Sequence, residues 1–195
     1  MRGDLPQYRK YKNMKRSLIA LSLAALLPLS AQADDKLSYT YVEADYINVD
    51  GDADGFGVRG SFEFGQSGFY GFGGYNTVEI DNTSIDVDSY DLGIGYAHGI
   101  SDNADLIAEL AYLNSDVDGL GDADGYRASV GLRGSFSENF EGLVKANYVD
   151  GDEFDGDFSG TIGAQYKFNQ TWGLVGEVEF ADGGESYLFG VRASF

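Results

Sequence analysis

Apolar and polar side chains alternate at every second position through most of this chain. In residues 126–136, Val130 and Leu132 fall on one phase, whereas Arg127 and Arg133 fall on the other. Successive side chains of a β-strand point to opposite faces, so this pattern predicts strands with one apolar and one polar face.

Ten such segments of about ten residues follow one another, which is the sequence pattern of a membrane-spanning β-barrel. They cover residues 37–48, 56–64, 69–80, 89–98, 105–115, 126–136, 140–149, 158–168, 172–181 and 186–195. We therefore expect an all-β fold, a closed antiparallel transmembrane barrel of ten strands, with eight strands as the alternative. Aromatic residues such as Phe56 and Phe64 bracket the apolar faces, as the two aromatic girdles of such barrels do.

The charged residues of these segments decide which face meets lipid. If the opposite face of the strands met lipid, six basic side chains would lie in hydrocarbon, each at a cost of about 2–4 kcal/mol near the midplane. We expect the charges to face the interior of the barrel, the lumen, and to pair there, because buried charges need partners. The expected lumen network comprises Arg59, Glu63, Glu109, Arg127, Arg133, Glu141, Lys145, Lys167, Glu177, Glu179 and Arg192. A packed ionic plug is favoured over a pore, since a ten-stranded barrel is only slightly wider than a filled one.

The N-terminus predicts a secreted protein. Met14–Arg16 is basic, Leu18–Leu29 is apolar, and Ala31–Ala33 is a small-residue cleavage site, which together are typical of a signal peptide. Residues 1–33 are therefore an N-terminal extension and a cleaved signal, and residues 34–195 form the barrel domain.

Charge and composition exclude one class of partner and two kinds of cysteine-based site. Without residues 1–33, seven of the 13 basic and 31 of the 32 acidic residues remain, a formal charge of −24. Nucleic acid is an implausible partner for such a surface. The chain has no cysteine, which excludes disulfides and thiolate metal sites.

Acidic residues gather in every second connection between the predicted strands. These connections are residues 50–55, 81–88, 116–125, 150–157 and 182–185. An even number of strands places both termini on the periplasmic side, so the acidic connections are expected to be extracellular. There they would meet lipopolysaccharide, whose anionic groups are cross-linked by divalent cations.

The first acidic connection is a candidate metal site. Asp50, Asp52 and Asp54 match the first half of a calcium loop, but Ser61 stands where an EF-hand requires glutamate. A helix–loop–helix site is therefore excluded, while a Ca²⁺ or Mg²⁺ ion held between neighbouring loops stays open beside simple solvation. No other cofactor is expected.

Catalysis has little support. The single histidine, His98, shares the phase of Leu92 and Ile94 and lies at the periplasmic end of its segment. The Asp–His or Ser–His arrangements of outer-membrane hydrolases are not available from it, so we expect no enzyme.

The last ten residues resemble the final strand of bacterial outer-membrane β-barrels. Tyr187, Phe189, Val191 and Phe195 share one phase, and the chain ends on an aromatic residue. The resemblance implies location in the outer membrane and recognition of this segment by the barrel-assembly machinery.

A narrower resemblance concerns Met14–Leu21, Tyr41–Ala44, Asp50–Gly55 and Val191–Phe195. These stretches are similar to a small outer-membrane protein family of xanthomonads, discussed as a vesicle-associated activator of plant immunity linked to quorum sensing and biofilm. The expected function is non-enzymatic: a structural or surface-interaction role in adhesion, biofilm, vesicles or signalling. Expected partners are outer-membrane lipid, lipopolysaccharide and an extracellular or host-surface molecule. The alternative is a narrow passive pore for small solutes or ions.

Overall fold

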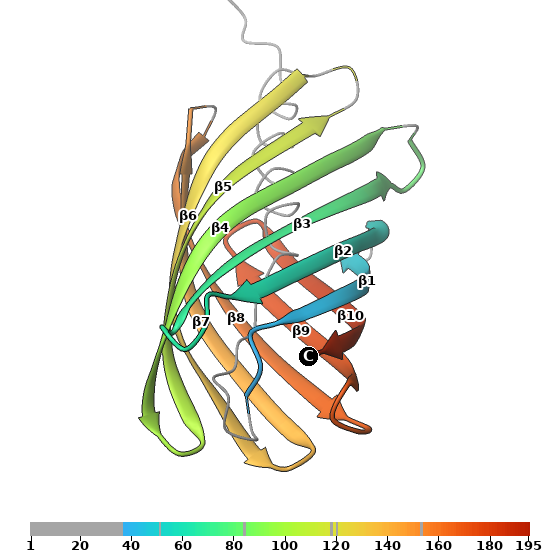
Figure 1. Ribbon diagram of the computed structural model, residues 1–195. Helices are drawn as coiled ribbons and strands as arrows, with labels where there is room; N and C mark the ends of the chain where they lie inside the picture. The colour runs from blue at the N-terminus through green and yellow to red at the C-terminus, as the bar shows by residue number, and fades with distance from the viewer. Residues whose placement is uncertain (1–36, 51, 84, 118, 120, 153) are drawn as a thin grey trace, which may run out of the picture.

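The chain forms one closed barrel of ten antiparallel strands (Figure 1). The computed structural model describes residues 37–195 except 51, 84, 118, 120 and 153, so the predicted extension and signal peptide lie outside the described residues. The strands are β1 (Tyr41–Val49), β2 (Ala53–Glu63), β3 (Phe69–Ile80), β4 (Asp86–Ser101), β5 (Ala104–Val117), β6 (Gly121–Ser137), β7 (Phe140–Gly151), β8 (Phe154–Lys167), β9 (Trp172–Ala181) and β10 (Gly184–Ser194). The prediction of a ten-stranded antiparallel barrel is confirmed.

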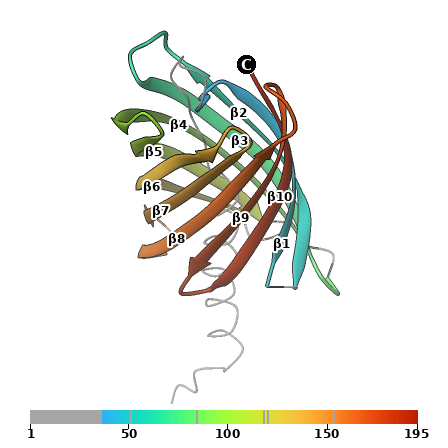
Figure 2. The same ribbon diagram turned by 90° about the horizontal axis from the view of Figure 1, so that it is seen from below.

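The barrel closes where β1 pairs with β10, with Tyr41 opposite Ser194 and Val49 opposite Ser186. Figure 2 shows these two strands side by side at the seam. The amide N of Phe195 donates to the carbonyl O of Thr40 over 2.9 Å and extends the seam by one more contact. Closure satisfies the backbone groups that an open sheet edge would leave unpaired in lipid.

The two-residue alternation separates an apolar exterior from a charged lumen. In β6, Val130 is 59% exposed, whereas Arg127 is 1% exposed. The girdle residues Phe56 and Phe64 are exposed at opposite ends of β2 and its turn. No helix in the described part of the chain is long and apolar enough to cross a membrane.

Several strands run further than the sequence predicted at the end of the barrel that is predicted to be extracellular. This end is called the extracellular end, and the opposite end is called the periplasmic end. β4 begins at Asp86 instead of residue 89, and β6 begins at Gly121 instead of residue 126. Asp122 and Asp124, predicted to lie in a loop, therefore belong to a strand. Beyond the aromatic girdle the outward positions face water, so the alternation continues without apolar residues to mark it.

The predicted start of the first strand was wrong. β1 begins at Tyr41, and residues 37–40 lie outside the ladder at the periplasmic end. Leu37 and Tyr39 are buried there. Both share the phase of the strand that follows, so periodicity does not distinguish a strand from this segment, which we call the strap.

Candidate functional site in the barrel lumen

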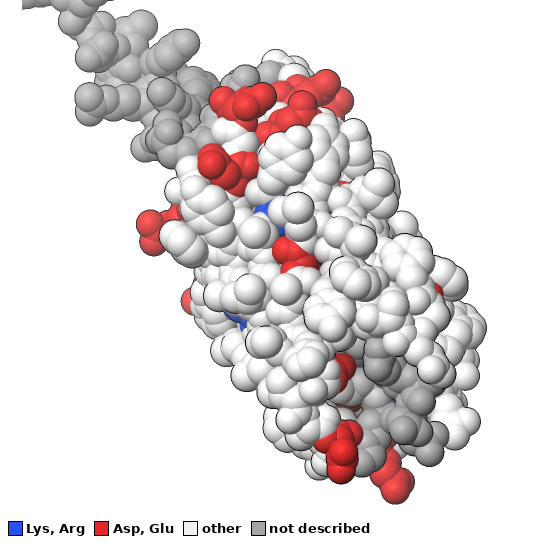
Figure 3. Space-filling model, turned by 60° about the vertical axis from the view of Figure 1, so that its left-hand side comes forward, with Lys and Arg blue, Asp and Glu red and all other residues white. Residues whose placement is uncertain are grey.

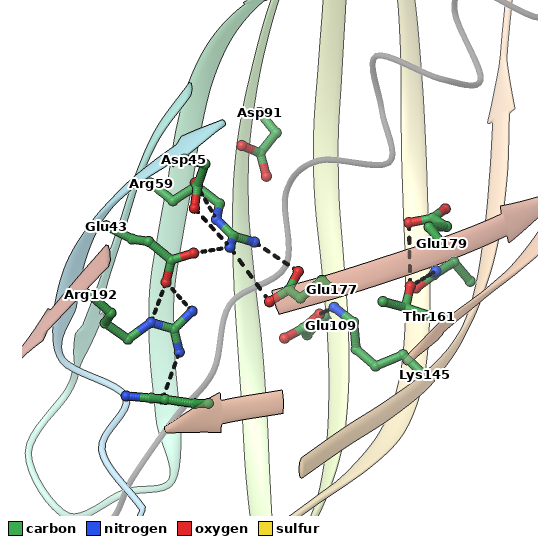
Figure 4. Close-up of polar contacts among 12 residues, drawn as sticks. Glu43, Asp45, Arg59, Asp91, Glu109, Lys145, Thr161, Glu177, Glu179 and Arg192 are labelled. Carbon is green, nitrogen blue, oxygen red and sulfur yellow. Dashed lines mark hydrogen bonds and ion pairs between the residues drawn. The ribbon is translucent and has the colours of Figure 1, made fainter. Parts of the chain in front are cut away.

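Arg59 is the centre of the largest ion-pair group in the lumen (Figure 4). Its guanidinium contacts Asp45 Oδ2 at 2.9 Å and Glu177 Oε2 at 3.1 Å, and it also pairs with Glu43. The four side chains come from β2, β1 and β9, and all are buried. Closure of the barrel brings Glu177 to Arg59, because β1 and β10 are the only strands between β2 and β9 on that side.

Arg192 extends this group towards the periplasmic end. It pairs with Glu43, its Nη1 donates to Gln165 Oε1 over 3.3 Å, and its guanidinium lies 4.0 Å from the centroid of the Tyr41 ring. Glu43 therefore lies between two guanidinium groups. An arginine over an aromatic face adds a cation–π attraction, which is stronger where water is excluded.

A second group lies on the wall formed by β3 to β9. Lys145 Nζ lies 2.7 Å from Glu109 Oε2, and the Tyr70 hydroxyl donates to Glu109 Oε1 over 2.7 Å. Arg127 Nη2 lies 3.5 Å from Asp91 Oδ2. Glu179 accepts hydrogen bonds from the hydroxyls of Ser159 and Thr161.

The strap crosses the periplasmic end of the lumen. The Tyr39 ring stacks on Tyr70 with centroids 4.5 Å apart, and its hydroxyl donates to Asp105 Oδ2 over 3.0 Å. Arg133 Nη1 donates to the carbonyl O of Ser38 over 3.3 Å, and Arg133 also pairs with Glu141. The strap is thereby joined to β3, β5 and β6.

The structure places all of the predicted lumen charges on the inner face. Lys167 pairs with Glu141, so each predicted basic residue has a carboxylate partner. Glu63 is half-buried at the periplasmic end of β2. The sequence missed Glu43, Asp45 and Asp91, although their positions on the inward phase were a signal that could have identified them.

The predicted metal ligands are not brought together. Asp50 lies in the turn after β1 with φ of 51° and accepts a hydrogen bond from the amide N of Glu185 over 2.8 Å. Asp54 is an exposed residue of β2 that faces Glu79 across the ladder. Within the described ranges, no group of three acidic, histidine or cysteine residues is arranged to hold a metal ion.

Acidic residues instead form an outward-facing belt at the extracellular ends of the strands. Asp116 of β5 lies opposite Asp88 on one side and Asp122 on the other. The Tyr75 hydroxyl of the girdle donates to Asp88 Oδ1 over 2.6 Å. Figure 3 shows carboxylates gathered at the upper end of the barrel and a few more at the lower end and along the sides, on a surface that is otherwise mostly uncharged.

The C-terminal motif lies on the exterior beside the seam. Phe189, Val191 and Phe195 are exposed, and the Tyr187 hydroxyl donates to Glu185. The motif is therefore on the face that meets lipid.

Removing the Tyr39 hydroxyl should weaken the barrel modestly. We expect Tyr39→Phe to lower the free energy of unfolding by about 1 kcal/mol, because a hydrogen bond to Asp105 is lost while the stacked ring stays. Urea unfolding in lipid vesicles measures this. Tyr75→Phe removes the same kind of hydrogen bond at an exposed site and should leave the free energy of unfolding unchanged. Equal losses of stability in the two variants would contradict a structural role for the strap.

The geometry is that of a porin-like barrel, and comparison with solved structures agrees. The KdgM porin superposes with a TM-score of 0.52 at 13% sequence identity, over 80% of this chain and 99% of that one. The KdgM porin in complex with disordered oligogalacturonate superposes with a TM-score of 0.50 at 13% identity, over 80% and 99% of the two chains. The chain therefore has the fold of outer-membrane porins.

Sequence comparison finds two proteins named YaiT, both described as uncharacterized. The Salmonella typhimurium protein is 30% identical over 175 residues, and the Escherichia coli protein is 28% identical over 172 residues. The matches cover 74% and 71% of this chain but only 17% of each relative's length. No family model matches the chain.

Proposed function

We propose that the protein is a narrow passive pore of the outer membrane that admits small solutes or ions. The observation that carries this proposal is the likeness to the KdgM porin, which extends over 80% of this chain and nearly all of the other. The sequence favoured a surface-interaction role, with the pore as the alternative. The porin fold supports that alternative better.

The arrangement of the ion pairs is compatible with passage through the lumen. The pairs named above join strands that are at most three positions apart around the ten-stranded barrel, such as β2 with β9 and β5 with β7. Most of them therefore span a short arc of the circumference, while the Arg59–Glu177 pair reaches across two intervening strands. A barrel of this strand number has a narrow bore, so the proposed solutes are small.

Outer-membrane location, assembly by the barrel-assembly machinery and contact with lipopolysaccharide belong to the same proposal. The porin fold supports the location, and the exposed C-terminal aromatic residues support recognition by the machinery. Cleavage of residues 1–33 stays a prediction, as does the role in vesicles, biofilm and plant immunity that the xanthomonad resemblance implies.

One observation favours a second function, a surface-interaction role. The acidic belt places like charges directly opposite one another at Asp88, Asp116 and Asp122, which is unfavourable unless cations or a partner compensate them. Divalent cations shared with lipopolysaccharide would do so. A loss of cell adhesion or biofilm on replacing these three aspartates with asparagine, with conductance unchanged, would support this second role.

Planar-bilayer recording tests the pore. The purified protein, shown to be folded by a heat-modifiable shift on gel electrophoresis, should give steady unitary conductance at neutral pH. The steps should be smaller than those of a 16-stranded porin under the same conditions, because bore grows with strand number. Folded protein that inserts but gives no conductance would contradict the proposal.

A further inference from the structure

The lumen holds no surplus of positive charge that could attract anions. Among the described residues, seven carboxylates and five basic side chains are buried. Each of the basic ones has a carboxylate partner. One buried carboxylate has no basic partner among the described residues: Glu179, which accepts hydrogen bonds from the hydroxyls of Ser159 and Thr161.

The entrance adds to this imbalance. The five extracellular connections, residues 50–55, 81–88, 116–125, 150–157 and 182–185, contain no lysine, arginine or histidine. An entrance lined by one sign of charge, with walls of low dielectric constant, focuses the field and concentrates ions of the opposite sign. Cations should therefore be enriched at the mouth and anions depleted.

Two buried polar side chains on the wall have unused hydrogen-bonding capacity. Asp91 of β4 is 4% exposed, and neither of its oxygens accepts a hydrogen bond of ordinary geometry from a described residue. Its distance of 3.5 Å from Arg127 exceeds the roughly 2.7–2.9 Å of a charge-assisted hydrogen bond. Asn76 of β3 is 0% exposed, and its amide O and N have no partner within the described part of the chain.

These two side chains are close neighbours on one wall. Asn76 lies opposite Ser89 in the β3–β4 ladder, and Asp91 is the next inward residue of β4 after Ser89. Ser89 and Ser115 hydroxyls lie 2.8 Å apart beside them. Asp91 itself faces Gly74, which has no side chain to cover it. A buried polar group without a hydrogen bond, such as the Asn76 amide, costs about 1–3 kcal/mol, which a bound ion would relieve, while Asp91 keeps its ion pair with Arg127 beside it.

We propose that the lumen passes monovalent cations in preference to anions, and that Asp91 and Asn76 form a weak cation-binding site on its wall. The carboxylate supplies the charge, and the amide and serine oxygens supply neutral ligands, which are the groups that hard cations prefer. This inference rests on the proposed pore. A single carboxylate with neutral oxygens suits an ion in transit better than a tightly held metal.

The reversal potential across a planar bilayer in a KCl gradient tests the proposal with K⁺ as the probe. The native protein should give the sign of a cation-selective pore. Asp91→Asn should lower the ratio of K⁺ to Cl⁻ permeability by about two- to fivefold, as expected for removing one charge a few ångströms from an ion in a water-like medium. Asn76→Asp should raise it.

Glu138→Gln is the matched control, because it removes one carboxylate from an exposed periplasmic turn outside the lumen. It should leave the ratio unchanged. Anion selectivity of the native protein would overturn the proposal. If neither Asp91→Asn nor Asn76→Asp changes the ratio of K⁺ to Cl⁻ permeability relative to this control, the proposed binding site is wrong. If Asp91→Asn does not fold, Asn76→Asp alone decides. Absence of any conductance would instead overturn the pore itself and this inference with it.

Discussion

Replacing Arg59 with alanine should lower the free energy of unfolding of the barrel by about 3–5 kcal/mol, the cost of removing one partner from a buried ion pair. The substitution leaves Glu43, Asp45 and Glu177 close together in the lumen without their shared counter-ion. Urea unfolding in lipid vesicles measures the effect through Trp172, the only tryptophan of the chain, which lies exposed on the lipid-facing side.

Two further variants identify the cause. Arg59→Lys keeps the charge but lacks a guanidinium that reaches three carboxylates. Its free energy of unfolding should therefore lie between those of the native protein and the alanine variant. Val58→Ala truncates the neighbouring residue on the exterior and should have a much smaller effect. A loss below about 1 kcal/mol for Arg59→Ala would mean that the group is not buried and paired as described.

An arginine placed on the lipid face at mid-height should also be strongly destabilising. Val130 is exposed between the girdle residues Tyr126 and Phe136 of β6, so we expect Val130→Arg to cost about 2–4 kcal/mol. Tyr126→Arg introduces the same charge at the interface and should cost only about 0–1 kcal/mol. The same unfolding assay compares them, and equal costs at the two depths would contradict the assigned orientation in the membrane.

Much of the fold can be predicted because the membrane imposes two simple constraints. Backbone groups in lipid must be hydrogen-bonded, and charges must point away from hydrocarbon. The alternation of Val130 and Leu132 with Arg127 and Arg133 satisfies both in only one orientation. This is why the number of strands and the inward direction of the charges follow from the sequence.

The missed residues lie where this pattern is weak. In β1, Ile47 and Val49 are buried in the lumen while Val42 and Tyr46 are exposed, so both faces carry apolar residues and the inward Glu43 and Asp45 do not stand out. Which charges pair also depends on the register of strands distant in sequence. Arg59 and Glu177 are 118 positions apart, and only closure of the barrel brings them together.

The strap and the strand ends were mispredicted for a related reason. Tyr39 keeps the phase of β1, but its ring stacks on Tyr70 of β3 instead of joining the ladder. At the other end, the lipid no longer selects apolar residues beyond the girdle, and Asp122 and Asp124 continue β6 into water. The alternation of side chains in the sequence does not reveal the change from strand to strap or the change from lipid to water.

The alternation of β6 side chains between the lipid-facing exterior and the lumen is the central claim, and it can be measured directly. The chain has no native cysteine, so a label would attach only at an introduced one. Single cysteines at positions 127–130, 132 and 133 would carry a spin label in vesicles, and collision with oxygen would report contact with lipid. Gly131 is left out because a Cβ there would lie 2.4 Å from the carbonyl O of Val144. High oxygen accessibility at positions 128, 130 and 132, and low accessibility at 127, 129 and 133, is the predicted result. Accessibility without a two-residue period, or labels at 127 and 133 in contact with lipid, would contradict it.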